Sequence, residues 1–484
     1  MNRIISRIAF SFIIIFAFGS GAYAQKNIVD IEFDIKNYEN DTMILGFYFG
    51  SKTLVLDTLL ADKKGKFRYQ KDTLLEPGIY LSLFRPGNNF YQFMVNNEDQ
   101  KFKLSGTFDG EALKPTGSKD NELFYDYINL ITLKGMERAQ VLEAIEEAKS
   151  KDKDYAKLQE EIDAMDTTVK TEMDKIINEH SNTMTAMLLK SNIGIDIPEF
   201  NAEGEELQFL RYNYYKSHYF DNIDLQNPAV LRSPFLDEKV NYFMEKLTVQ
   251  HPDSIYESID YLLKKMEGNE EIFQFYTSTF LNKYANANII GYDAIYVKMI
   301  ENYYAKGKAP WVEQETLDKF IENADKLRPI LIGEKAPPIT FYKEDGEELA
   351  LYDIDSEYTV MIFWSHTCGH CKKAMPDLIE FYNKWNPKGV EVLGICTKHR
   401  SELKSCFEFA KEKELPWLNV GDEFHKSKFR DIYNVVSTPR VFILDKDKEI
   451  LLKRVPTEKL DEIMESLVKE MQMKRQKELD FQKQ

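Results

Sequence analysis

The chain has 484 residues, of which 43% are hydrophobic and 13% aromatic, so it has enough apolar material for more than one core. A chain of this length is expected to form about three domains. Its 80 acidic and 63 basic residues give a net charge of −17, and such a surface repels phosphates. Nucleic acid and anionic membranes are therefore excluded as expected partners. Four cysteines are too few for a disulfide-stabilised scaffold, so each requires its own explanation.

The first 24 residues have the layout of a secretory signal peptide. Arg3 and Arg7 precede or flank the start of an apolar run at 8–18, and Ala22-Tyr23-Ala24 is a small-x-small cleavage site. The run is about eleven residues long, whereas a membrane-spanning helix needs about 20. We therefore predict cleavage after Ala24 and a periplasmic mature protein with no stable membrane insertion, in a compartment where disulfides persist. The alternative is an uncleaved anchor.

Residues 25–117 are predicted to form an all-β sandwich domain. Apolar and polar residues alternate in short runs such as TLVLDTLL, PGIYLSLF and QKFKLSGTF, with Gly65, Pro77-Gly78 and Pro86-Gly87 between strands. Short, regularly spaced strands with such turns are typical of an antiparallel sandwich or barrel. The region has no histidine and no cysteine, so we expect it to serve folding or docking.

Residues 118–330 are predicted to form a mainly α-helical domain. Ser118 to Glu122 offers helix-capping side chains ahead of the apolar stretch LFYDYINLI. Glu, Lys, Ala and Leu recur at helical spacing through 136–180, which indicates a long helix or a helical hairpin. The tyrosine-rich cluster RYNYYKSHYF, at 211–220, is interpreted as core or interface, with ligand binding as the alternative.

Residues 331–470 alternate strands and helices, and a charged tail follows at 471–484. A strand at Tyr358–Trp364 runs into the segment FWSHTCGHCKKAMP, and helices then alternate with the strands VEVLGIC and TPRVFILD. This alternation predicts an α/β fold with a parallel core, and a hairpin at DKDKE adds an antiparallel edge. A Cys-x-x-Cys pair at a strand-to-helix junction in such a pattern is typical of a thioredoxin fold.

The pair consists of Cys368 and Cys371. Unpaired N–H groups and the helix dipole at the start of a helix favour negative charge, so we expect a stabilised, attacking thiolate at Cys368. Cys371, one turn later, is expected to be shielded and to resolve the mixed disulfide. Gly369 is expected to keep the junction uncrowded. His370 is expected to donate a hydrogen bond to the thiolate or to carry charge beside it, which tunes the pair toward oxidation.

A second motif lies about seventy residues further on, in the segment VVSTPRVFILD. Pro439 follows Thr438 and precedes a strand, where thioredoxin folds place a cis-proline opposite the cysteine pair. Only about 5–6% of X–Pro bonds in folded proteins are cis, so such a bond normally has a purpose. We expect it to turn the backbone of Thr438 outward to pair with an incoming peptide as an added strand.

The region from about Ile332 to Leu467 resembles a TlpA/ResA-like thioredoxin-family domain. The segments that carry the resemblance are GEKAPPITF, DGEELALYDI, VMIFWSHTCGHCKKAMP, VEVLGICT, YNVVSTPRVFILDKD and the final helix. The resemblance implies a periplasmic thiol–disulfide oxidoreductase without cofactor or metal, with Cys368 as nucleophile, Cys371 as resolving thiol and Pro439 as substrate-loop proline. Its expected partners are cysteine-containing envelope proteins and an unidentified redox partner.

The region from Lys26 to about Pro329 resembles the small β-domain and helical domain that often precede such modules in Gram-negative envelope proteins. That resemblance implies no known chemistry. We expect the front region to bind substrate or to form a homodimer.

Two positions depart from the family pattern. Ala374 stands where many reductive members carry a glutamate after the CKK that follows the pair, and Thr367 replaces the tryptophan often found before the first cysteine. The Gly-His dipeptide between the cysteines resembles that of protein disulfide isomerase. These differences favour an oxidising or isomerising couple over a strong reductant, and the direction of exchange otherwise stays open.

A metal site is the main alternative reading of the pair. His366, Cys368, His370 and Cys371 lie within six residues and offer ligands for copper or zinc, as in a metallochaperone or thiol sensor with little turnover. Structural zinc sites usually draw ligands from two segments, and the sequence has no second CxxC. A purely structural disulfide within CxxC would constrain little chain entropy.

The other two cysteines leave two interpretations open. Cys396 ends a predicted strand, and Cys406 shares a helical face with apolar residues, so it should point inward. Both are either small buried hydrophobic residues or the two ends of a strand–helix disulfide.

Overall fold

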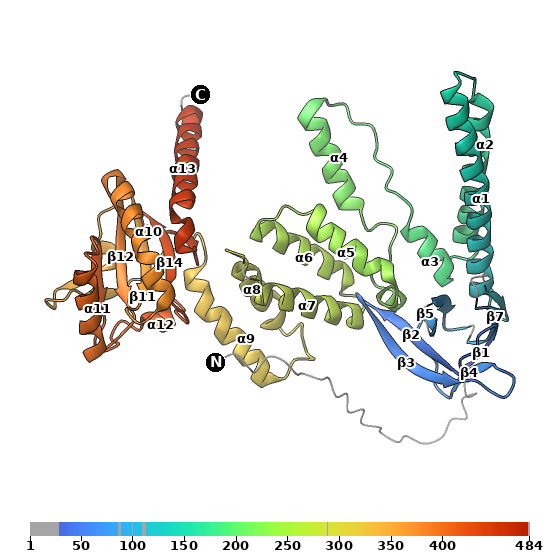
Figure 1. Cartoon of the computed structure of the whole chain (residues 1–484), viewed down its shortest axis with the longest axis horizontal. Coiled ribbons are helices and arrows are strands. Elements are labelled where there is room, and N and C mark those ends of the chain that lie inside the picture. Colours follow the sequence, from blue (N-terminus) through green and yellow to red (C-terminus); the bar gives the residue numbers. More distant parts are fainter. Residues whose placement is uncertain (1–28, 86–88, 99, 109–112, 288, 483–484) are drawn as a thin grey trace. The chain divides into compact units, whose positions relative to one another are not determined.

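The computed structural model describes residues 29–482 apart from 86–88, 99, 109–112 and 288, so the predicted signal peptide lies outside the described residues. Strands dominate the front of the chain, helices the middle, and a mixed sheet with helices the end, which confirms the predicted multidomain fold class (Figure 1). The chain divides into two compact units, one ending at Val240 and one beginning at Asn241. This division falls within α5 (Pro234–Lys246), so the helical region contributes to both units.

The first unit begins with two four-stranded sheets that share one core. One sheet has the order β4-β1-β7-β8 and the other β3-β2-β5-β6. Their bounds are β1 (Val29–Lys36), β2 (Thr42–Phe49), β3 (Lys52–Leu60), β4 (Phe67–Lys71), β5 (Gly78–Phe84), β6 (Asn89–Val95), β7 (Lys101–Thr107) and β8 (Lys114–Thr116). Buried aromatic side chains from both sheets, including Phe33 and Phe93, pack edge to face. The predicted sandwich was expected to be antiparallel, but β1 and β7 pair in parallel, because the chain visits the second sheet between them.

Helices follow the sandwich. They are α1 (Lys119–Ser150), α2 (Ala156–Glu179), α3 (Met184–Ser191), α4 (Gly204–His218) and the short η1 (Pro228–Arg232). The Ser118 side chain caps α1 by accepting a hydrogen bond from the backbone N–H of Asn121. The helical stretch predicted for 136–180 is a hairpin of α1 and α2 (Figure 1). Helix α4 has no fully buried side chain, and in the tyrosine-rich cluster only Tyr219 and Phe220 are buried, so the core interpretation holds for the end of that cluster alone.

The second unit starts with a further group of helices. They are α6 (Pro252–Met266), α7 (Glu270–Ala285), α8 (Asp293–Met299), the π-helix η2 (Ile300–Tyr304), α9 (Gln314–Leu327) and η3 (Arg328–Ile330). Buried residues of α6 recur every three or four positions, for example Ile255, Ile259, Leu262 and Met266, as expected for a helix with one face in a core.

A seven-stranded sheet follows, with the order β10-β9-β13-β12-β11-β14-β15. Its strands are β9 (Thr340–Tyr342), β10 (Glu348–Ala350), β11 (Tyr358–Trp364), β12 (Val390–Cys396), β13 (Leu418–Gly421), β14 (Arg440–Asp445) and β15 (Ile450–Lys453). Strands β11, β12 and β13 pair in parallel, which confirms the predicted parallel core, and β14 and β15 form the predicted antiparallel hairpin. Strand β14 also pairs antiparallel with β11, whereas the alternation of strands and helices had placed it in the parallel core.

Strand β11 lies in the middle of this sheet and is buried on both faces. Val360, Ile362 and Trp364 belong to one core, and Met361 and Phe363 belong to another. Successive side chains of a strand point to opposite faces, so a strand covered on both sides reads as a continuous apolar run. That is why YTVMIFW contains no charged residue.

The remaining helices complete the domain. They are α10 (Gly369–Trp385), α11 (Ser401–Glu412), α12 (Phe429–Ile432), α13 (Leu460–Gln482) and the short η4 (Leu351–Asp353), η5 (Asn386–Lys388) and η6 (Thr457–Lys459). Helix α13 continues through most of the segment that was expected to be a charged tail. Within the described part of the chain, none of the helices is long and apolar enough to span a bilayer.

Candidate active site

The cysteine pair lies where buried strand β11 leads into helix α10. Cys368 is the N-cap residue of α10, and its backbone N–H donates to the carbonyl of Ser365 at 3.1 Å. Its Sγ accepts a hydrogen bond from the backbone N–H of Cys371 at 3.2 Å. An N-cap side chain satisfies N–H groups that have no partner within the helix, and here a sulfur takes that position. Cys368 therefore lies at the positive end of the helix.

The two thiols differ in exposure and acidity. Both are free; Cys368 is half-buried, whereas Cys371 is only 1% exposed. Burial raises the pKa of Cys368, but hydrogen bonds from Cys371, from the Thr438 side chain and from backbone N–H groups outweigh it and lower the pKa below its ordinary value. Burial, together with the neighbouring Cys368, raises the pKa of Cys371 to about 12. The exposed member of the pair is thus the one that ionises more readily.

The predicted substrate-loop residues lie against the exposed thiol. Cys368 Sγ donates to the backbone carbonyl of Thr438 at 3.4 Å, although 70 residues separate them. The peptide bond between Thr438 and Pro439 is cis. The structure therefore brings together Cys368, Cys371, Thr438 and Pro439 from the two motifs of the sequence.

The two residues between the cysteines are both exposed. Nothing outside the local chain lies within 4 Å of where a Cβ of Gly369 would stand, so this position is open and not crowded. His370 is exposed, and its backbone N–H is the group that helps lower the pKa of Cys368.

The described residues do not assemble the four-ligand metal site. Among them, no group of three or more His, Cys, Asp or Glu side chains is arranged to hold a metal ion. His366 instead places its Nδ1 3.4 Å from Sγ of Cys406.

Cys396 and Cys406 form a disulfide, with their Cα atoms 6.4 Å apart. The bond joins the end of β12 to α11, and each cysteine is 1% exposed. Of the two interpretations left open by the sequence, the strand–helix disulfide is therefore the correct one. A Cα separation of this kind depends on how the strand and helix pack, which spacing along the chain does not reveal.

Several pockets lie in the described part of this domain. One, of about 400 Å³, is lined by His370 and Pro439 and therefore adjoins the cysteine pair. Its charged residues Arg440 and Arg454 were not identified from the sequence, since only the fold brings them beside α10. The clue in the sequence was weak: Arg440 directly follows Pro439.

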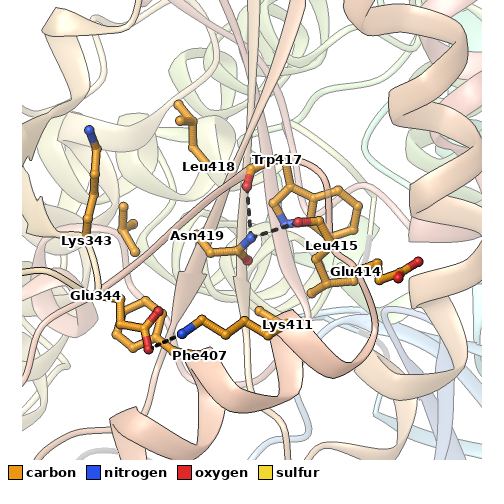
Figure 2. Close-up of a pocket in the computed structure, with 11 residues that line it drawn as sticks. Lys343, Glu344, Phe407, Lys411, Glu414, Leu415, Trp417, Leu418 and Asn419 are labelled. Atoms are coloured by element: carbon orange, nitrogen blue, oxygen red, sulfur yellow. Dashed lines mark hydrogen bonds and ion pairs between the residues drawn. The ribbon is translucent and has the colours of Figure 1, made fainter.

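A second pocket, of about 330 Å³, lies between α11 and β13 (Figure 2). Asn419 donates to the backbone carbonyls of Leu415 and Trp417, and Lys411 pairs with Glu344 at 2.7 Å across its mouth (Figure 2). Behind it, a Cβ on Gly394 would approach Trp417 Nε1 to 2.6 Å, so only glycine lets that ring pack on β12. The pocket contains none of the predicted site residues, and we assign it no chemistry.

Comparisons with known proteins agree with this geometry. Residues 332–453 match the AhpC/TSA family, whereas residues 164–327 and 29–124 match two domains of unknown function. The thiol-disulfide oxidoreductase ResA of Bacillus thuringiensis subsp. konkukian is 27% identical over 143 residues, which cover 29% of this chain and 78% of that protein.

Solved structures with the same coverage were also found. A domain of a possible thiol-disulfide isomerase from Cytophaga hutchinsonii is 32% identical, with 30% of this chain and 97% of that one covered and a TM-score of 0.28. A thiol:disulfide interchange protein from Bacteroides sp. is 26% identical, with 28% and 90% covered and a TM-score of 0.27. These similarities concern the C-terminal domain.

Proposed function

The C-terminal domain belongs to the thioredoxin family as a TlpA/ResA-like thiol–disulfide oxidoreductase, and from this premise we propose how and where the chain acts. It exchanges disulfides with cysteine-containing envelope proteins through the Cys368-Gly369-His370-Cys371 motif. The observation that carries the proposal is the difference between the two thiols: Cys368 is half-buried and caps α10, whereas Cys371 is buried, and the pKa of Cys368 is lowered while that of Cys371 is raised.

Exchange proceeds in two steps when the reduced pair meets a substrate disulfide. The Cys368 thiolate attacks one substrate sulfur, an S–S bond forms between them, and the other substrate sulfur leaves as a thiolate. Cys371 then loses its proton and attacks Cys368 Sγ, which forms the Cys368–Cys371 disulfide and releases the second substrate thiolate. Two electrons pass to the substrate, and the reverse sequence oxidises a substrate dithiol.

Substrate docking is proposed to use the loop at Thr438 and Pro439. The carbonyl of Thr438 lies 3.4 Å from Cys368 Sγ, so a peptide bonded to this backbone would hold its cysteine close to the attacking sulfur. An extended peptide on this loop would resemble an added strand.

The oxidising or isomerising direction is favoured over reduction. A lowered pKa at Cys368 stabilises the reduced pair, and a pair with a stable reduced form is a stronger oxidant. Ala374, which replaces the acid found in many reductive members, supports the same direction. A separate redox partner would return the pair to its starting state.

A periplasmic location is supported by the signal-peptide pattern of residues 1–24. We propose that cleavage after Ala24 leaves Gln25 as the first residue and that the front domains bind substrate or form a homodimer. The mass of the protein recovered from the periplasm tests the cleavage: a species beginning at Gln25 is expected, and an uncleaved chain would refute it.

The experiment that tests the function is the trapping of mixed disulfides in cells. Cys371→Ala cannot resolve the intermediate, so envelope proteins should be recovered covalently bound to Cys368. The matched control is Cys371→Ala combined with Cys368→Ala, which should trap nothing. A folded Cys371→Ala protein that traps no partner would count against exchange with envelope proteins.

A further inference from the structure

The pocket of about 400 Å³ adjoins the position at which a substrate cysteine would react. It begins at His370 and Pro439 and extends along the first turns of α10 to the start of β14 and the segment after β15. Neighbouring residues of an extended peptide are about 3.3 Å apart along the chain. A peptide bonded to Cys368 would therefore place residues close to its cysteine in this pocket.

The charge of the pocket is opposite in sign to that of the chain. Lys373, Arg440 and Arg454 line it together with two carboxylates, Asp377 and Glu458. The lining is therefore more basic than acidic, whereas the whole chain has a net charge of −17.

The cations of the pocket have no carboxylate partner. In the ranges that the structure describes, no ion pair joins Lys373, Arg440 or Arg454 to an acid. Arg440 Nη2 donates to the backbone carbonyl of Asn434 at 2.9 Å, while its Nε is buried without a hydrogen-bond partner among the described residues. Arg440 is half-buried and lines the pocket, and a partly desolvated guanidinium with few partners favours binding of an acceptor.

Asp293, the acid that acts on Arg440 electrostatically, is paired with a lysine. Asp293 of α8 pairs with Lys453 of β15, with 2.6 Å between the carboxylate oxygen and Nζ. Burial and then neighbouring Arg454 lower the pKa of Arg440 to about 10, and Asp293 opposes this only in part. Asp293 therefore offsets the positive charge of Arg440 only in part.

We propose that the pocket binds a carboxylate of the substrate, so that the preferred substrates carry Asp or Glu within about three residues of the reacting cysteine. This inference rests on the proposed function. The guanidinium groups of Arg440 and Arg454 match a carboxylate in shape and charge. Ala374, also in the lining, leaves the space that a longer acidic side chain would fill.

The test uses the full-length mature chain and three synthetic peptides. Each peptide has one cysteine, which is bonded to a small thiol as a mixed disulfide. They differ only in the residue two positions from the cysteine: Glu, Gln or Lys. We expect kcat/KM for the Glu peptide to exceed that for the Gln peptide by about tenfold, and the Lys peptide to be slower still. Because the net charge of the chain disfavours acidic peptides at long range, this preference would report on the pocket itself.

Substitutions in the pocket test whether it causes the preference for the Glu peptide. The measured quantity is the ratio of kcat/KM for the Glu peptide to that for the Gln peptide. Arg454→Gln and Lys373→Gln, both at exposed positions, should each lower the Glu-to-Gln ratio to about threefold or less, whereas Glu458→Gln should raise it. Lys404→Gln, which makes the same charge change at an exposed position of α11 outside the pocket, should leave the ratio unchanged.

The outcomes separate the two proposals. Equal rates for the three peptides, with exchange intact, would overturn the pocket inference and leave the oxidoreductase proposal in place. An equal fall of the ratio in Lys404→Gln would also overturn it, since the preference would then come from overall charge. Absence of exchange with every peptide would contradict the proposed function and the inference with it.

Discussion

Two cysteine pairs lie in the same domain and are held in different ways. Cys368 and Cys371 are free and lie three residues apart at one helix start, with one sulfur half-buried and the other buried. Cys396 and Cys406 come from a strand and a helix, are bonded to each other, and are both 1% exposed. Equal burial suits a cross-link that stays closed. We propose that unequal burial lets Cys368 attack the substrate while Cys371 stays protonated until it resolves the mixed disulfide.

The two pairs are nevertheless neighbours. His366 lies two residues before Cys368, and its Nδ1 is 3.4 Å from Sγ of Cys406. Both pairs contribute to one hydrophobic core, with Cys368 packed against it. Their separate roles therefore follow from exposure and bonding, and the predictions below distinguish them by experiment.

The largest expected effect is the loss of exchange when Cys368 is removed. Cys368→Ala lacks the attacking sulfur, so turnover of a peptide disulfide should fall by on the order of 10³ or to the uncatalysed background. The matched control is the double variant Cys396→Ala/Cys406→Ala, whose turnover should stay within about threefold of wild type. Comparable losses in both proteins would remove the distinction between the pairs.

For the free energy of unfolding, the order of the two pairs should be reversed: loss of the Cys396–Cys406 bond should have the larger effect. The Cys396–Cys406 bond closes a loop with a sequence separation of 10, and opening it should lower the free energy of unfolding by about 3 kcal/mol. Denaturant unfolding, followed by tryptophan fluorescence, measures this change because all four tryptophans lie at or after residue 311, in the second unit.

Two comparisons complete that measurement. The double variant is compared with the wild-type chain, oxidised and reduced, since the reduced chain keeps both sulfur atoms without the bond. Cys371→Ala breaks no disulfide, so its free energy of unfolding should not fall by a comparable amount. An unchanged midpoint in the double variant and in the reduced chain would contradict the structural role of the bond.

The two active-site thiols should differ in their rates of alkylation. The rate at Cys368 should rise with pH and level off below its ordinary thiol pKa of 9.0, since its own pKa is lowered and only the thiolate reacts. The rate at Cys371 should stay at least about tenfold lower through pH 9, because its pKa is about 12 and its sulfur is buried. Mass spectrometry of peptides after iodoacetamide treatment separates the two rates. Equal rates would contradict the assignment of nucleophile and resolving thiol.

The smallest expected effect concerns Ala374, three residues after Cys371 on α10. Residues three apart on a helix are neighbours, so Ala374→Glu would place a negative charge beside Cys371 and disfavour the thiolate form of the pair. The midpoint potential should become more negative by about 30 mV, equivalent to about 1.4 kcal/mol. Ser401→Glu, at an exposed position of α11, is the control and should cause no shift. A shift to a less negative potential would contradict this explanation of the direction of exchange.

The sequence predicted the elements that depend on local pattern. The apolar run of β11, the helix that follows it and the Thr438-Pro439 motif were legible because periodicity and motif order define them. Strand β13 was not predicted, because Leu418–Gly421 is only four residues long and too short to show a period. The parallel pairing of β1 with β7 was missed because it depends on where the chain crosses between sheets.

The site was predictable only in part, for a related reason. Cys368 and Cys371 belong to one continuous motif, whereas the Cys396–Cys406 bond depends on how α11 packs on β12. The cationic pocket draws Lys373, Arg440 and Arg454 from segments up to 81 positions apart, a separation fixed by their numbers in the sequence. Nothing in the spacing of these residues indicates that they share a cavity.

The measurement that tests the central claim most directly is the midpoint potential of the Cys368–Cys371 pair. The purified mature chain is equilibrated against glutathione mixtures, and the redox state of each pair is read by peptide mapping. We predict a reversible two-electron couple at Cys368 and Cys371, with a midpoint of about −180 to −120 mV, while Cys396–Cys406 stays oxidised. A midpoint near about −270 mV would contradict the oxidising direction. The absence of any reversible couple at this pair would contradict the account as a whole.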